Sequence, residues 1–257
     1  MSLLGLPNEI LLVIAENLRT TKDTSSLLLT NRRLSSLLTP HLHDLATHEK
    51  TGLNALAWAT MKGHKELMKL LVLRKGFDID APDNLCGLPA LHHAMTSRIP
   101  FSVRQLLVEL GANVYTRTRD GREPIHQAAG IGCQETIQLF LGKGVDINSL
   151  DGRGHTVLYR AAVMYSPLMV DFLLRNGADV DMRNRDGKTA IHGAAEGGSL
   201  ASINILLRNG ADTSIRSDAG KTARDYAKRM NFCRVVKLLE SASEKGIEVK
   251  DSNSLEN

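Results

Sequence analysis

Two tripeptides are the first candidates for chemistry in this sequence, because they resemble the end of a phosphate-binding loop. They are Gly187-Lys188-Thr189 and Gly220-Lys221-Thr222. Such a loop needs a further glycine five residues before the first one, and those two positions hold Met182 and Ile215. The motif therefore fails at both places, and neither tripeptide predicts nucleotide binding.

The nine histidines and three cysteines are the next candidates, because both residue types bind metals and act in catalysis. His92, His126 and His192 share one position of a periodic pattern, so they belong to separate layers and are not expected to converge on one ion. No Cys-x-x-Cys, His-Glu-x-x-His or Gly-x-Ser-x-Gly motif occurs. We therefore predict no catalytic residue, no metal site and no cofactor, and we expect a protein that is not an enzyme.

The composition is that of an ordinary globular protein. Of 257 residues, 42% are hydrophobic and 23% charged, whereas only 4% are aromatic, which favours helices over a β-sandwich. A net charge of +4 is too small to predict nucleic-acid binding. The start of the chain does not read as a secretory signal, and no run approaches the ~20 apolar residues of a membrane span. Three widely spaced cysteines fit a reducing compartment, so we expect a cytoplasmic or nuclear location, or both.

Six short segments recur at a nearly constant interval. They are NALAWA (54–59), PALHHA (89–94), EPIHQA (123–128), TVLYRA (156–161), TAIHGA (189–194) and TARDYA (222–227). The steps between their third residues are 35, 34, 33, 33 and 33. A second marker, a glycine followed two residues later by Asp or Asn, keeps the same period at Gly76, Gly111, Gly144, Gly177 and Gly210. Two markers with one period predict a repeat protein.

Each repeat predicts two helices and an extended turn. In the fifth repeat Thr189 suits a helix N-cap, Leu206 lies in an apolar stripe with helical spacing, and Gly210 suits the residue after a helix. Pro100 and Pro167 precede second helices and are predicted as first helical residues. One such unit cannot bury its apolar face, but stacked units can. The predicted fold is therefore an all-α solenoid with Leu206 in its core.

The pattern resembles the ankyrin repeat through its Thr-Pro-Leu-His-x-Ala, Leu-Leu and Gly-Ala-Asp landmarks. The best matches are DGREPIHQAAGIG and DGKTAIHGAAEGG. The resemblance covers residues 48–240 and implies about six repeats, in which the shared histidines make structural hydrogen bonds. Their approximate bounds are 48–82, 83–117, 118–150, 151–183, 184–216 and 217–240. Residues 241–257 lack the landmarks and are predicted to be a mobile polar tail.

The first 45 residues lie outside the period and predict a small helical module. They resemble an F-box through Leu6-Pro7-x-Glu9-Ile10 and Thr30-Asn31-Arg32-Arg33-Leu34, and through the apolar residues Ile14, Leu18, Leu27 and Leu28. An F-box followed directly by ankyrin repeats is similar to an arrangement common in filamentous fungi. The resemblance implies docking on the Skp-type adaptor of a cullin–RING ubiquitin ligase. The contacts would be made by Leu6, Pro7, Glu9, Ile10, Ile14, Leu18, Leu27 and Leu28.

Repeated positions of a solenoid stack into columns, so the sequence also predicts a partner surface on repeats 3 to 6. Its basic residues are Arg119, Arg122, Arg153, His155, Arg185, Lys188 and Lys221, and its exposed apolar residues are Ile131, Met164 and Met230. An apolar patch with a charged rim is typical of a binding site. The partner would be a protein with an acidic segment and an apolar anchor. The alternative is that the charges only keep the fingers soluble and that the apolar residues fill space between helices.

These features predict the substrate-receptor subunit of a Skp–cullin–F-box ligase, in which residues 1–45 recruit the ligase and the repeats hold a protein substrate. The main alternative is an ankyrin scaffold or transcription co-regulator whose N-terminal helices only cap the solenoid. The sequence leaves the substrate and the oligomeric state open.

Overall fold

A computed structural model describes residues 55–73, 77–164 and 166–252 of the chain. The chain divides into two compact units, residues 1–116 and 117–257. The described residues are helical apart from turns, loops and one isolated β-bridge between Leu150 and Thr156. This confirms the predicted all-α fold. None of the helices in the described ranges combines the length and hydropathy needed to cross a bilayer.

The described helices come in pairs, each with a first and a second helix. In residues 55–116 the helices are α4 (Ala55–Lys62), α5 (Lys65–Val72), α6 (Ala90–Ala94) and α7 (Phe101–Glu109). In residues 117–252 they are α8 (Pro124–Gly130), α9 (Gln134–Leu141), α10 (Val157–Val163), α11 (Pro167–Arg175), α12 (Ala190–Gly197), α13 (Leu200–Arg208), α14 (Ala223–Arg229) and α15 (Cys233–Ser252).

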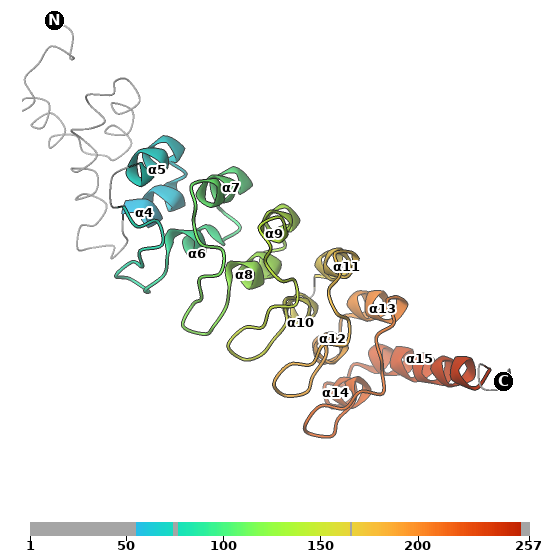
Figure 1. Cartoon of the computed structure of the whole chain (residues 1–257). Coiled ribbons are helices and arrows are strands. Elements are labelled where there is room, and N and C mark those ends of the chain that lie inside the picture. Colours follow the sequence, from blue (N-terminus) through green and yellow to red (C-terminus); the bar gives the residue numbers. More distant parts are fainter. Residues whose placement is uncertain (1–54, 74–76, 165, 253–257) are drawn as a thin grey trace, which may run out of the picture. The chain divides into compact units, whose positions relative to one another are not determined.

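Within residues 117–252 the pairs stack into two rows. The first helices α8, α10, α12 and α14 contact one another in sequence, and the second helices contact one another from α11 through α13 to α15 (Figure 1). The loops that precede the first helices project from the stack as fingers (Figure 1). This arrangement brings residues about 33 positions apart into neighbouring layers, as the period predicts.

Two details of the predicted boundaries are wrong. The tail predicted to begin at residue 241 is helical as far as Ser252, because α15 continues without a break from Cys233. Pro100 is the N-cap of α7 rather than its first helical residue, since its ψ of 148° is extended. Pro167 does stand at the first position of α11, where its missing N–H costs no hydrogen bond.

The core lies between the two helix rows. Ile191 and Leu206 of the fifth repeat are fully buried, and Phe140 is among the largest fully buried side chains in the described residues. Burying one such side chain contributes about 1.5–3 kcal/mol to folding. The predicted burial of Leu206 is thereby confirmed. Gly210 follows α13 with φ = 83°, so it ends this helix in the left-handed conformation expected of a glycine.

Candidate partner-binding surface

The fingers of the fourth and fifth repeats are each built around one polar side chain. In the fourth repeat Asp151 Oδ1 accepts the backbone N–H groups of Arg153 (2.9 Å) and His155 (2.8 Å). In the fifth, Asn184 Oδ1 accepts those of Asp186 (3.0 Å) and Lys188 (2.8 Å) in the same way. A single side chain therefore satisfies two backbone donors and fixes the conformation of the fingertip.

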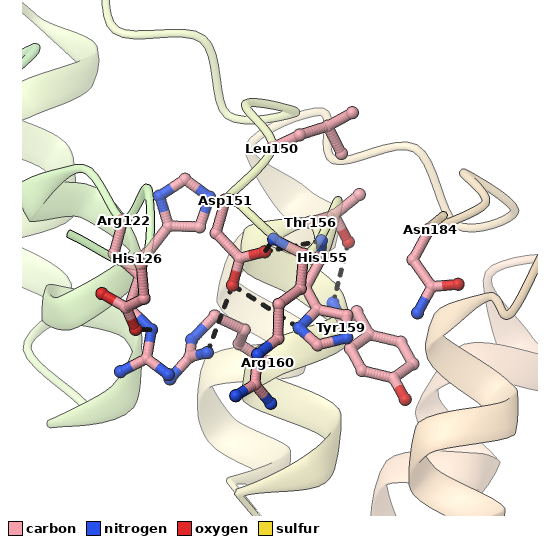
Figure 2. A network of polar contacts seen from close by, with 12 residues as sticks. Arg122, His126, Leu150, Asp151, His155, Thr156, Tyr159, Arg160 and Asn184 are labelled. Carbon is pink, nitrogen blue, oxygen red and sulfur yellow. Dashed lines mark hydrogen bonds and ion pairs between the residues drawn. The ribbon is translucent and has the colours of Figure 1, made fainter. Parts of the chain in front are cut away.

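Asp151 also joins its finger to the first helix of the repeat (Figure 2). Its side chain is 1% exposed, and Oδ2 lies 3.3 Å from Nη1 of Arg160 on α10. Burial raises the pKa of Asp151, but the hydrogen bond from the His155 N–H, the nearby His155 ring and the Arg153 N–H outweigh it, and the pKa is lowered. The carboxylate is therefore charged at neutral pH. The His155 ring stacks on the Tyr159 ring, with 4.7 Å between the ring centroids. Burial lowers the pKa of His155, which favours its neutral form. The positive charge that faces Asp151 is therefore supplied by Arg160.

The shared histidines connect neighbouring repeats. The His126 ring accepts the Glu123 N–H at Nδ1 (3.3 Å), so its Nε2–H donates to the Ser149 carbonyl (3.1 Å) in the next finger. His192 is held in the same way, with the Thr189 N–H 3.1 Å from Nδ1 and the Lys221 carbonyl 3.3 Å from Nε2. Burial lowers the pKa of both histidines, which favours the neutral ring. The predicted structural hydrogen bonds are confirmed.

The predicted basic residues fall into two groups. Arg119, Arg153 and Lys221 are exposed, and within the part of the chain that the structure describes their side chains make no hydrogen bond or ion pair. Their charges are therefore open to a partner. Arg185 is exposed too, but its guanidinium donates to the Gly152 carbonyl of the preceding finger.

The second group is held within the chain. Arg122 pairs with Asp120 (2.8 Å), and the His155 side chain is only 17% exposed beside Asp151. Lys188 is also 17% exposed and lies 3.1 Å from Glu196. Binding a partner's carboxylate with these side chains requires breaking or sharing existing contacts. The sequence did not distinguish them from the open cations, because all of them occupy fingertip positions.

One ionic cluster lies between the fifth and sixth repeats. Glu196 on α12 accepts from Lys188 (3.1 Å) and from Arg229 on α14 (2.7 Å). Both cations also lie over the Tyr226 ring, at 4.4 Å for Lys188 and 5.1 Å for Arg229. The cluster neutralises part of the predicted basic surface and ties α12 to α14. Lys188 is consequently better described as a packing residue than as a steering charge.

The apolar residues follow the ends of the first helices. Ile131, Met164 and Met230 are the C-cap residues of α8, α10 and α14. Met164 is 54% and Met230 45% exposed, whereas Ile131 is only partly exposed. Gly197 occupies the equivalent position in the fifth repeat. The row of exposed C-cap residues therefore lacks an apolar side chain in the fifth repeat, next to Glu196. Met164 on repeat 4 and Met230 on repeat 6 are separate apolar sites.

Comparison with known proteins assigns the repeats. A family model described as ankyrin repeats (3 copies) matches residues 30–118, 100–184 and 162–253. The chain belongs to the ankyrin-repeat family. Ankyrin repeats indicate a function in protein–protein interaction. No F-box domain is found, and the first ankyrin match begins inside the predicted 1–45 module.

Individual relatives are similar over less than half of the chain. The chain is 31% identical over 119 residues to human BCL-6 corepressor-like protein 1, covering 46% of this chain and 7% of that protein. It is 35% identical over 103 residues to the mouse B-cell lymphoma 3 protein homolog, covering 40% of this chain and 22% of that protein. It is 31% identical over 116 residues to E3 ubiquitin-protein ligase KEG of Arabidopsis thaliana, covering 44% of this chain and 7% of that protein. The chain thus spans less than a quarter of each relative.

The predicted adaptor-binding residues lie outside the described residues. All eight fall between Leu6 and Leu28, and the structure describes the chain from residue 55. Their role in docking an adaptor stays a prediction from the sequence.

The predicted partner surface on repeats 3 to 6 left out the most exposed apolar side chain of these repeats. Leu168, at the start of α11, is 77% exposed. The equivalent residues one period away are Glu135 and Ala201. A leucine at a position that is polar or small in neighbouring repeats was the available signal. Leu168 begins a second helix, so it extends the candidate apolar surface beyond the C-caps of the first helices.

Proposed function

We propose that this chain is the substrate-receptor subunit of a Skp–cullin–F-box ubiquitin ligase, acting in the cytoplasm or nucleus without chemistry of its own. Residues 1–45 dock on the Skp-type adaptor, and ankyrin repeats 3 to 6 bind a protein substrate. The ligase brings substrate and ubiquitin together, so this chain supplies proximity. The resemblance to a protein named as an E3 ubiquitin-protein ligase is consistent with this role.

The observation that carries the substrate-binding half is that repeats 3 to 6 expose both unpaired charges and apolar side chains. Arg119, Arg153 and Lys221 have no ionic partner among the described residues, and Met164 and Met230 are about half exposed. Unpaired cations steer an acidic segment toward the fingers, and methionines adapt to an irregular apolar anchor. The substrate segment is accordingly acidic with an apolar residue within it.

Charge reversal tests this half. The variant R119E/R153E/K221E removes the open charges without touching any described hydrogen bond of those side chains. Affinity purification of the full chain should lose the captured substrate, and kinetics with that substrate should show association slowed about tenfold or more at low salt. The matched control reverses three exposed cations on the second-helix row, Arg208, Arg234 and Lys237. Equal capture by both variants would place the partner on another face.

A second variant tests the apolar contact. Changing Met164 to aspartate places a charge against an apolar anchor, so the complex should dissociate faster with little change in association. Met164 is 54% exposed, so the fold tolerates the change. Glutamate in place of exposed Asn204 on α13 is the control for adding one negative charge elsewhere. An unchanged dissociation rate for the Met164 variant excludes this residue from the contact.

The adaptor-binding half is tested with a purified Skp-type adaptor. The double variant L6A/P7A should abolish adaptor binding while leaving the helical circular-dichroism spectrum of the repeats unchanged, because aliphatic anchors at interfaces contribute about 1–3 kcal/mol each. Undiminished binding by the double variant removes the F-box assignment.

The second candidate function is an ankyrin scaffold or transcription co-regulator. It is favoured by the ankyrin match that begins at residue 30 and by the similarity to a protein named as corepressor-like. In this case the N-terminal residues cap the repeats. Deleting these residues then lowers the stability of the solenoid, and the full chain captures no adaptor. Purifications with and without residues 1–45 therefore separate the two functions.

A further inference from the structure

Three potential metal ligands converge in the second repeat. Cys86 Sγ lies 3.5 Å from Asp83 Oδ2 and 3.7 Å from His93 Nε2, and His93 Nε2 also contacts Asp83 Oδ2. The Asp83 side chain is fully buried, the His93 side chain is 11% exposed, and Cys86 is partly exposed. The three ligand atoms lie within 4.8 Å of one another, and no other group of this kind occurs in the described residues.

The two oxygens of Asp83 have separate roles. Oδ1 accepts the N–H groups of Cys86 (2.8 Å), Gly87 (2.9 Å) and Leu88 (3.4 Å). This is the finger-forming role that Asp151 Oδ1 performs in the fourth repeat. Oδ2 is directed at the thiol and the imidazole. The carboxylate therefore forms the finger and still presents one oxygen to a ligand.

The second repeat departs from the others at the two residues that supply the other ligand atoms. Gly87 follows Asp83 by four residues, whereas Gly154 follows Asp151 by three, and this insertion accompanies Cys86. The place of His93 is taken in the fourth repeat by Arg160, whose guanidinium pairs with its own finger carboxylate. An arginine stays protonated and cannot ligate a metal. A histidine and a cysteine can both offer lone pairs to one.

We propose that Asp83 Oδ2, Cys86 Sγ and His93 Nε2 bind one Zn²⁺ ion, with a water molecule as the fourth ligand. Zinc accepts mixed sulfur, nitrogen and oxygen donors. Its bonds of about 2.0–2.3 Å put tetrahedral ligands about 3.3–3.6 Å apart, close to the 3.5 and 3.7 Å that separate the sulfur from its two neighbours. His93 Nε2 and Asp83 Oδ2 are in direct contact, so they move apart when the ion enters between them. The ion requires a thiolate and a neutral imidazole, so binding releases a proton from the thiol at neutral pH. It links the finger to α6.

The test measures zinc bound to the full chain. After the metal is stripped with a chelator, the chelator is removed and Zn²⁺ is added in excess, the wild type should retain one more equivalent of Zn²⁺ on gel filtration than either Cys86→Ala or His93→Gln. Glutamine is a conservative choice, because Gln127 occupies the equivalent position in the third repeat. Cys133→Ala removes another partly exposed cysteine and is the matched control, which should bind as much zinc as the wild type.

Cobalt provides a second readout that reports the ligands directly. Co²⁺ added to the wild type should give a thiolate-to-cobalt absorption band and tetrahedral visible bands, and Cys86→Ala should lose the thiolate band. Circular dichroism without metal should be the same for all variants, which separates lost ligation from misfolding. Equal zinc content in the wild type, Cys86→Ala and His93→Gln would overturn the proposal, as would a thiolate band that persists without Cys86.

Discussion

Replacing Asp151 tests whether one buried carboxylate holds the fourth finger in place. In Asp151→Ala, the N–H groups of Arg153 and His155 lose their acceptor, and the Arg160 side chain, 18% exposed, loses its countercharge. An orphaned buried donor costs about 1–3 kcal/mol, and breaking a buried ion pair from one side costs about 3–5 kcal/mol. Water reaches these groups in part, so we expect a total loss of about 3–5 kcal/mol.

Asp151→Asn is the matched comparison. An asparagine keeps the oxygen that accepts the two N–H groups, as Asn184 does in the fifth repeat, and loses only the charge facing Arg160. We expect this variant to lose about 1–2 kcal/mol. The hydrogen bonds to its oxygen and the nearby His155 ring outweigh burial and leave the native pKa of Asp151 below 3.8. The carboxylate therefore contributes its full stability above that pH, and the difference between wild type and Asp151→Asn should shrink as the pH falls below it.

Urea unfolding followed by circular dichroism at pH 7.5 gives the two free energies, and hydrogen exchange resolves which repeat opens, since repeat arrays can unfold in parts. The increased exchange should be confined at first to the fourth finger and α10. Equal losses for the alanine and asparagine variants would show that the hydrogen-bonded oxygen is unimportant. A loss below about 1 kcal/mol for alanine would refute the reasoning altogether.

Three further outcomes follow from the packing. Leu206→Ala should lower the free energy of unfolding by about 2–5 kcal/mol through cavity formation, and a loss below about 0.5 kcal/mol in urea titration would contradict its burial. Burial lowers the native pKa of His126 and His192 below 6.5, so the unfolded chain takes up protons first. Stability should therefore be complete above pH 6.5 and fall at lower pH by up to about 1.4 kcal/mol per unit for each histidine, whereas an unchanged urea midpoint between pH 7.5 and 5.5 would refute this. Gly154 and Gly177 both have positive φ, 73° and 89° respectively, so an alanine is strained at either position. A Cβ on Gly154 would also lie 2.9 Å from a backbone nitrogen of the next finger, whereas a Cβ on Gly177 would meet open space. Thermal melts should show Gly154→Ala losing at least twice the ~1–2 kcal/mol lost by Gly177→Ala.

Local chemistry determined the repeat and the all-α fold. The 33-residue spacing, the N-cap residue Thr189 and the C-terminal glycine Gly210 are read from neighbouring residues, because capping and helix termination act within one turn. Burial of Leu206 also followed, since only one face of an amphipathic helix can meet the stack. The end of α15 was not predicted, because a polar segment without landmarks has the composition of either a tail or an exposed helix.

Contacts between side chains from different segments were decided only by the tertiary structure. Lys188 and Lys221 occupy the same position in successive repeats, yet Lys188 packs over Tyr226 against Glu196 while the Lys221 side chain has no ionic partner in the described residues. The convergence of Cys86 and His93 on one oxygen likewise depends on how a finger folds back over its helix. Periodicity specifies which layer a residue occupies. The direction of each long side chain and the charge it meets depend on neighbours brought together by stacking, and a one-dimensional pattern does not contain that information.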